Sequence, residues 1–192
     1  MVFAYPESFI PDAMKNLGEM YEVAVHHYNY DIDDFQNIFL DCGVADGFSA
    51  GSIDLICGMT GKELFNYVLW SAKLKQVKLD RKEVSNNTDE YLAGASIAKF
   101  QRLTGKTFQE IHKFLPMSYV CQFVSNLWNM DESIIFEKLS LEFFIKKYPG
   151  EDHDLINMYI NCKRSFAANS SINLPDRSTQ NISKLGDNRH NI

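Results

Sequence analysis

The sequence predicts an all-α protein, a multi-helix bundle of two helical halves followed by a Ser/Asn-rich C-terminal tail. Apolar residues recur every three or four positions along most of the chain, which is the spacing of amphipathic helices. Helix-start residues and glycines punctuate these segments at the places where helices would begin and end. The apolar fraction is 45%, and the 14 Phe and 9 Tyr residues supply large side chains for a core.

The first half, residues 1–72, is predicted to open with a helix that has Ser8 as its N-cap and Pro11 in its first turn. The inward face of this helix is predicted to consist of apolar residues at helical spacing, namely Met14, Leu17, Tyr21, Ala24 or Val25, and Tyr28. A second helix is expected from Asp31, with Asp33 and Asp34 in its first turn, because the helix dipole favours negative charge there. Gly43 is its expected end.

Glycines at short intervals between residues 43 and 61 predict short helical turns joined by tight bends. Thr60 and Glu63 then have the spacing of a capping box, which starts a helix whose inward face is formed by Leu64, Val68, Leu69 and Ala72. The polar, charge-rich residues 73–86 are the predicted linker between the two halves.

The second half, residues 87–164, is predicted to contain several helices. Asn87 or Thr88 caps the first of them, and Gly105 ends it. The small residues Gly94, Ala95 and Ala98 would let a neighbouring helix come close. The helices that follow are expected to start at Thr107 with a second capping box, at Pro116, at Asp131, and at Asp152 after the stop at Pro149–Gly150.

The composition changes after residue 164. Residues 165–192 are rich in Ser and Asn, and residues 163–192 contain five Lys or Arg against two Asp. One interpretation of this tail is disorder. The other is a partial helix-turn-helix whose DNA-reading residues would be Arg177, Ser178, Thr179, Gln180 and Asn181, because Arg suits guanine and Gln suits adenine in the major groove.

Two short motifs resemble catalytic signatures but lack the rest of their patterns. Gly105–Lys106–Thr107 resembles the end of a phosphate-binding loop, yet Phe100 occupies the position of the required first glycine. Ser96 and Lys99 have the Ser-x-x-Lys spacing of serine acylases without the companion elements. Both are explained better by helix ends and a solvated lysine, so no catalytic residue is assigned.

No metal or cofactor site is expected either. The five His residues have no ligand spacing, and His26 and His27 point about 100° apart on a helix. The aspartates at 31, 33, 34 and 41 lack the glycine and terminal glutamate of a calcium loop.

The overall charge argues against a nucleic-acid-binding domain, because the chain has a net charge of -6 and a pI of about 5.3. The run 73–82 is locally basic, and it is interpreted as a solvated helical face or linker, with a nucleic-acid or acidic-partner patch as the alternative. The four cysteines (Cys42, Cys57, Cys121 and Cys162) show no CxxC pair and are expected to be reduced thiols. With no signal peptide and no apolar run of about 18 residues, the expected location is the cytoplasm, away from membranes.

The segment Tyr91–Ile111 resembles the pattern WxGWxLAxYQWxTGxSFxxI of an uncharacterised bacterial family. FIPDAMKNLGEMYEVAV, at residues 9–25, and GMTGKELF, at residues 58–65, are similar to that family's N-terminal half. The similarity runs from about Ser8 to about Leu141. Leu92, Ala95 and Arg102 stand where the family has aromatic residues.

Members of that family are small cytosolic proteins that are often encoded beside a putative ADP-ribosyltransferase-like toxin, and some carry a C-terminal helix-turn-helix. The resemblance therefore implies a non-catalytic helical interaction protein, an antitoxin-like component of a toxin–antitoxin system, whose partner is the neighbour-encoded toxin-like protein. The alternative is a DNA-binding transcriptional regulator that uses the C-terminal basic segment.

Overall fold

The structure is a computed structural model that describes residues 5–78, 83–127 and 130–150. Within these ranges the chain forms nine α-helices and no strand, which confirms the all-α, multi-helix prediction. The helices are α1 Ile10–Glu22, α2 Ile32–Asp41, α3 Val44–Ser49, α4 Ile53–Ile56, α5 Gly61–Ser71, α6 Asp89–Thr104, α7 Phe108–His112, α8 Met117–Ser125 and α9 Glu132–Lys147. A 3-10 turn (η1, Glu7–Phe9) precedes α1, and a π-helical turn (η2, Val23–His27) extends it.

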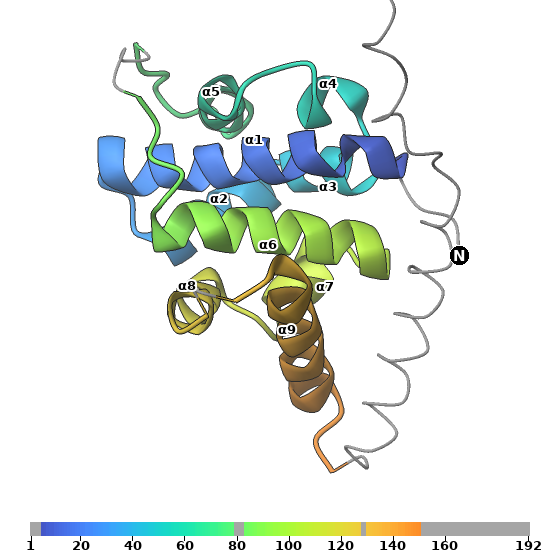
Figure 1. Cartoon of the computed structure of the whole chain (residues 1–192). Coiled ribbons are helices and arrows are strands. Elements are labelled where there is room, and N and C mark those ends of the chain that lie inside the picture. The colour runs from blue at the N-terminus through green and yellow to red at the C-terminus, as the bar shows by residue number, and fades with distance from the viewer. Residues whose placement is uncertain (1–4, 79–82, 128–129, 151–192) are drawn as a thin grey trace, which may run out of the picture.

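The centre of the molecule is the antiparallel pair α1 and α6, which have the most extensive contact of any two elements (Figure 1). In Figure 1, α4 and α5 lie on one side of this pair, and α8 and α9 lie on the other. Both central helices are therefore buried over much of their circumference. α1 buries Ala13, Leu17, Met20 and Tyr21, which is more than one narrow face.

Two glycines allow α1 and α6 to lie this close. A Cβ atom on Gly94 of α6 would be 2.7 Å from the Leu17 carbonyl oxygen and 2.7 Å from the Tyr21 ring. A Cβ atom on Gly18 of α1 would be 2.9 Å from the Tyr91 ring of α6. Real side chains do not tolerate such distances, so the predicted close approach at Gly94 is confirmed, with α1 as the neighbour.

The two halves that the sequence predicts on either side of residues 73–86 share one hydrophobic core. That core contains Leu17 and Phe65 from the first half and Phe100 and Phe143 from the second. The described part of the linker, residues 73–78 and 83–86, is not helical. This excludes the solvated helical face for residues 73–78, and the linker interpretation fits them.

Four of the predicted helix starts are confirmed by side-chain hydrogen bonds. Asp31 accepts from the backbone N–H of Asp33 and Asp34, and Thr88 accepts from the N–H of Tyr91. Thr60 and Thr107 each form a reciprocal capping box with the glutamate three residues later. At the other end of a helix, Gly105 has φ +66° and ends α6 as predicted.

The predicted N-cap at Ser8 is wrong. Ser8 lies inside the 3-10 turn, and α1 begins at Ile10 after Phe9, without a side-chain cap. The Ile10 N–H donates to the Glu7 carbonyl, so the turn itself satisfies the backbone there. Pro11 lies in the first turn, as expected.

The predicted helix 152–164 and the tail 165–192 lie outside the described residues. Among the helices that are described, none combines the length and the apolar character that crossing a bilayer demands.

We expect Gly94→Ala to lower the free energy of unfolding by about 1–3 kcal/mol, because the added methyl forces α1 and α6 apart. Urea unfolding followed by circular dichroism measures this loss. The matched control is Ser96→Ala on the same helix, at a half-buried position, which should change stability by less than about 0.5 kcal/mol. Equal stability of Gly94→Ala and the wild type would contradict the close packing of α1 on α6.

Candidate functional site

The outer face of α5 carries two large aromatic side chains that the core does not use. The inward face of this helix, Leu64, Phe65, Val68 and Leu69, is fully buried. Tyr67 and Trp70 are instead 39% and 58% exposed. Their rings stack on each other, with centroids 5.5 Å apart and an interplanar angle of 27°. Exposed aromatic side chains of this size are typical of surfaces that bind another molecule.

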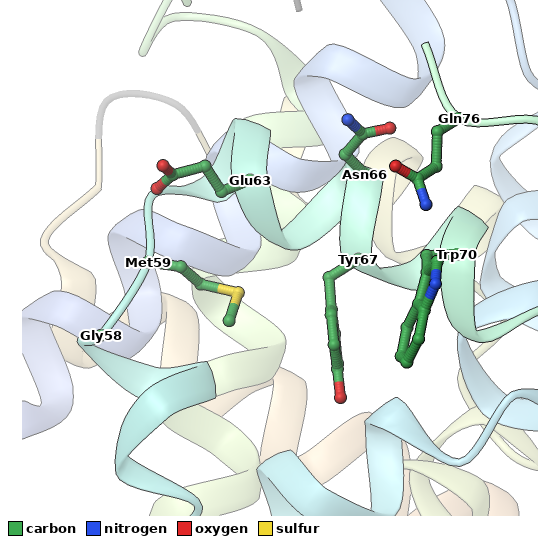
Figure 2. Close-up of a pocket in the computed structure, with 7 residues that line it drawn as sticks. All are labelled: Gly58, Met59, Glu63, Asn66, Tyr67, Trp70 and Gln76. Atoms are coloured by element: carbon green, nitrogen blue, oxygen red, sulfur yellow. The ribbon is translucent and has the colours of Figure 1, made fainter.

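A hollow of about 400 Å³ opens beside these rings. It is lined by Gly58, Met59, Glu63, Asn66, Tyr67, Trp70 and Gln76. Figure 2 shows the two rings running side by side from α5, with the Met59 side chain extending toward them from the segment before the helix. We call Met59, Tyr67 and Trp70 the aromatic surface.

One edge of the hollow is fixed by polar residues of α1. The Asn16 amide donates to the carbonyl oxygens of Ile56 (2.6 Å) and Met59 (2.8 Å). The Glu19 carboxylate accepts from the N–H of Gly61 at 3.1 Å, at the first residue of α5. These contacts hold the end of α4, the segment carrying Met59 and the start of α5 against one rigid helix.

The other edge is formed by the chain after α5, which turns back along the helix. Lys73 has a left-handed conformation (φ +56°), and the Leu74 N–H donates to the Leu69 carbonyl at 2.8 Å. The Asn66 side chain then forms two hydrogen bonds with the backbone of Val77, at 3.0 and 3.1 Å. Gln76 is thereby placed at the edge of the hollow.

A second groove, of about 370 Å³, lies between α1, α6 and α9. Ser96 and Lys99 both line it, so the structure brings this Ser-x-x-Lys pair to one cavity. Most other lining residues are apolar, and none of those lining it is a His or a carboxylate. The described residues that line this groove therefore supply no His or carboxylate to act with the pair, which favours the structural interpretation of Lys99.

A polar cluster joins the end of α1 to the start of α6. The buried Glu22 carboxylate accepts from the Thr88 hydroxyl and from the Ser85 N–H at 3.3 Å. His26 Nε2 lies 2.7 Å from a Glu90 oxygen. These contacts satisfy groups at the beginning of α6, so the cluster has a clear structural role.

Two of the thiols in the described part of the chain, Cys42 and Cys121, have a pKa raised away from the reactive thiolate form. Burial raises the pKa of the Cys121 thiol to about 12, with Glu90 and Asp89 adding to the rise. Burial also raises the pKa of the Cys42 thiol. Both are protonated at neutral pH, which disfavours nucleophilic chemistry at either position.

The other motifs find structural roles where they are described. Gly105 and Thr107 end α6 and cap α7, which explains the phosphate-loop resemblance. Asp33 accepts from the Ser118 N–H at 3.0 Å and so caps α8 from another helix. Within the described part of the chain, no group of three or more His, Cys, Asp or Glu residues is placed to hold a metal ion. The predicted DNA-reading residues lie outside the described residues: Arg177, Ser178, Thr179, Gln180 and Asn181.

The aromatic surface was not predicted from the sequence. Tyr67 and Trp70 lie three positions apart and outside the inward face predicted for residues 61–72. Their position outside the inward face indicated possible exposure to solvent, but an aromatic residue outside that face is often covered by another helix or loop. Only the packing shows that α5 leaves these two rings exposed.

Comparison of the chain with protein-family models, with curated proteins and with solved structures finds no match.

The capping box at the edge of the hollow predicts a pH dependence. The Thr60 N–H donates to the Glu63 carboxylate, and this bond lowers the pKa of Glu63 below its usual 4.5. Because the pKa of Glu63 is lower in the folded state, its carboxylate stabilises the fold at pH values above the usual pKa. This contribution is lost as the pH falls through the lowered pKa. We therefore expect Glu63→Gln to flatten the loss of stability between about pH 5 and pH 3.

Urea unfolding at a series of pH values measures this slope. Glu110 forms the equivalent box with Thr107, and its pKa is also lowered by a backbone hydrogen bond. Glu110→Gln should therefore flatten the slope in the same window, and the double variant should flatten it further. A Glu63→Gln slope identical to that of the wild type would contradict the role of this hydrogen bond.

Proposed function

We propose that this protein is a non-catalytic interaction protein that binds a partner protein through the aromatic surface. The observation that carries the proposal is the exposed, mutually stacked pair Tyr67 and Trp70 beside a hollow. Trp and Tyr are the residues most enriched among those that dominate binding energy at protein interfaces. Stacking also restricts both rings before binding, so little side-chain entropy is lost when a partner covers them.

The rigidity of the surroundings supports the same proposal. The hollow is held on one edge by Asn16 and Glu19 of α1, and on the other by the Asn66 contacts with Val77. A surface that is already in place binds with a smaller ordering cost than a mobile loop. The non-catalytic part of the proposal is supported by the protonated state of Cys121 and by the helix-joining contacts of Glu22 and Glu90.

The finer proposal concerns the partner's identity. From the resemblance to a family often encoded beside an ADP-ribosyltransferase-like toxin, we propose that this chain is an antitoxin-like component whose partner is the neighbour-encoded toxin-like protein. The alternative proposal is that the basic tail binds DNA. It is supported by the charge of residues 163–192, which contain five Lys or Arg and two Asp. Its residues Arg177–Asn181 lie outside the described ranges.

Co-expression with the neighbouring gene product tests the proposal. We expect a complex that survives purification and relieves the partner's toxicity. Trp70→Ala should weaken it by about tenfold or more, because the variant removes the largest ring that is exposed in the described part of the chain. Isothermal titration calorimetry measures the affinity, and growth after induction measures the toxicity.

Tyr148→Ala is the matched control. Tyr148 is also an exposed aromatic residue (43%) stacked on a neighbour, Phe144, but it follows α9 at the other end of the molecule. It should bind like the wild type. The proposal fails if no complex forms, or if Trp70→Ala and Tyr148→Ala bind equally well.

A further inference from the structure

The aromatic surface lies in a basic part of an acidic chain. Residues 62–78 contain four Lys and one Glu, a formal charge of +3, whereas the whole chain has -6. Lys73, Lys75 and Lys78 are exposed. Among the described residues, none of these three lysines has a carboxylate within ion-pair distance.

The one acidic side chain in this segment is already engaged. The Glu63 carboxylate accepts from the Thr60 N–H at 2.8 Å and from the Thr60 hydroxyl at 2.9 Å. It is therefore held at the start of α5, while the lysines follow the helix at its other end. Lys75 directly precedes Gln76 in the sequence, and Lys73 lies three positions after Trp70, so a ligand that covers Trp70 and Gln76 is close to both lysines.

Building on the proposed function, we propose that the partner contributes an acidic segment with an apolar side chain. The apolar side chain enters the hollow between Met59 and Tyr67, and the carboxylates on either side of it face Lys73 and Lys75. The two parts do different work. Burial of the apolar side chain supplies affinity, while the lysines select acidic segments and accelerate their encounter with this protein.

Single-stranded nucleic acid is the competing ligand, because it also combines negative charge with groups that stack on aromatic rings. Two observations favour the acidic polypeptide. Tyr67 and Trp70 cover each other's inner faces, which leaves less ring surface for bases. The net charge of -6 repels a polyphosphate more strongly than a short acidic segment, because the polyphosphate carries more negative charge.

Selection from a random-peptide phage library against the full chain tests the inference without knowledge of the partner. We expect selected peptides to have more Asp and Glu than Lys and Arg, together with an aromatic residue or Leu. Their affinity should fall about tenfold in Trp70→Ala. It should also fall when NaCl is raised to about 0.5 M, because salt screens the lysines.

Charge reversal gives the sharper result. Selection against the double variant Lys73→Glu/Lys75→Glu should yield peptides that are no longer acidic. The matched control is Lys113→Glu/Lys138→Glu, which makes the same change in net charge at two exposed positions, one directly after α7 and one on α9. Peptides selected against this control should remain acidic. Circular dichroism of both variants should match the wild type.

The outcomes separate the inference from the proposed function. Peptides that depend on Trp70 but carry no acidic excess overturn the inference and leave a protein-binding surface in place. Peptides whose affinity is the same for Trp70→Ala and the wild type overturn both the inference and the proposed function. Saturable, Trp70-dependent quenching of tryptophan fluorescence by an oligothymidine overturns the inference in favour of nucleic acid.

Discussion

The close crossing of α1 and α6 is the constraint on which the rest of the structure depends. Gly18 and Gly94 let the two backbones approach until a single methyl group would not fit between them. This crossing joins one helix from each side of the linker and closes the core across it. Because the helices are locked at this distance, α1 becomes a fixed support for the elements packed on its other side.

The polar residues of α1 convert that support into a positioned surface. Asn16, Glu19 and Glu22 follow one another at three-residue spacing, and each binds groups outside its own helix. Asn16 and Glu19 hold the end of α4 and the start of α5, while Glu22 holds the start of α6. Buried polar groups must be satisfied, so each of these contacts specifies one position for its partner segment. The orientation of Tyr67 and Trp70 follows from that chain of contacts.

The parts of the fold that could be predicted from the sequence are those set by local chemistry. Asp31, Thr60, Thr88 and Thr107 cap helices because a short side chain needs only the backbone two or three residues away. The burial of Asn16 and Glu22 could not be predicted from the apolar periodicity, because their partners are distant in the sequence. The Ser8 prediction was wrong because a 3-10 turn competes with a side-chain cap for the same groups.

The candidate site was harder to predict than the fold. In the sequence, an exposed pair of aromatic residues cannot be distinguished from a buried pair. The positions of α4, α5 and the returning linker decide between the two. The basic character of residues 73–82 was visible in the sequence, but its meaning depends on what lies beside it. Placed next to the aromatic surface, residues 73–78 become part of a specific patch.

Hydrogen exchange on Asn16→Ala tests most directly whether α1 positions the aromatic surface. This change removes the side-chain amide that donates hydrogen bonds to the carbonyl oxygens of Ile56 and Met59. Amides of residues 57–64 should then exchange about tenfold faster, while α8 and α9 keep their protection and the exposed control Gln109→Ala on α7 resembles the wild type. Unchanged exchange at residues 57–64, or equal acceleration in every helix, would contradict the account.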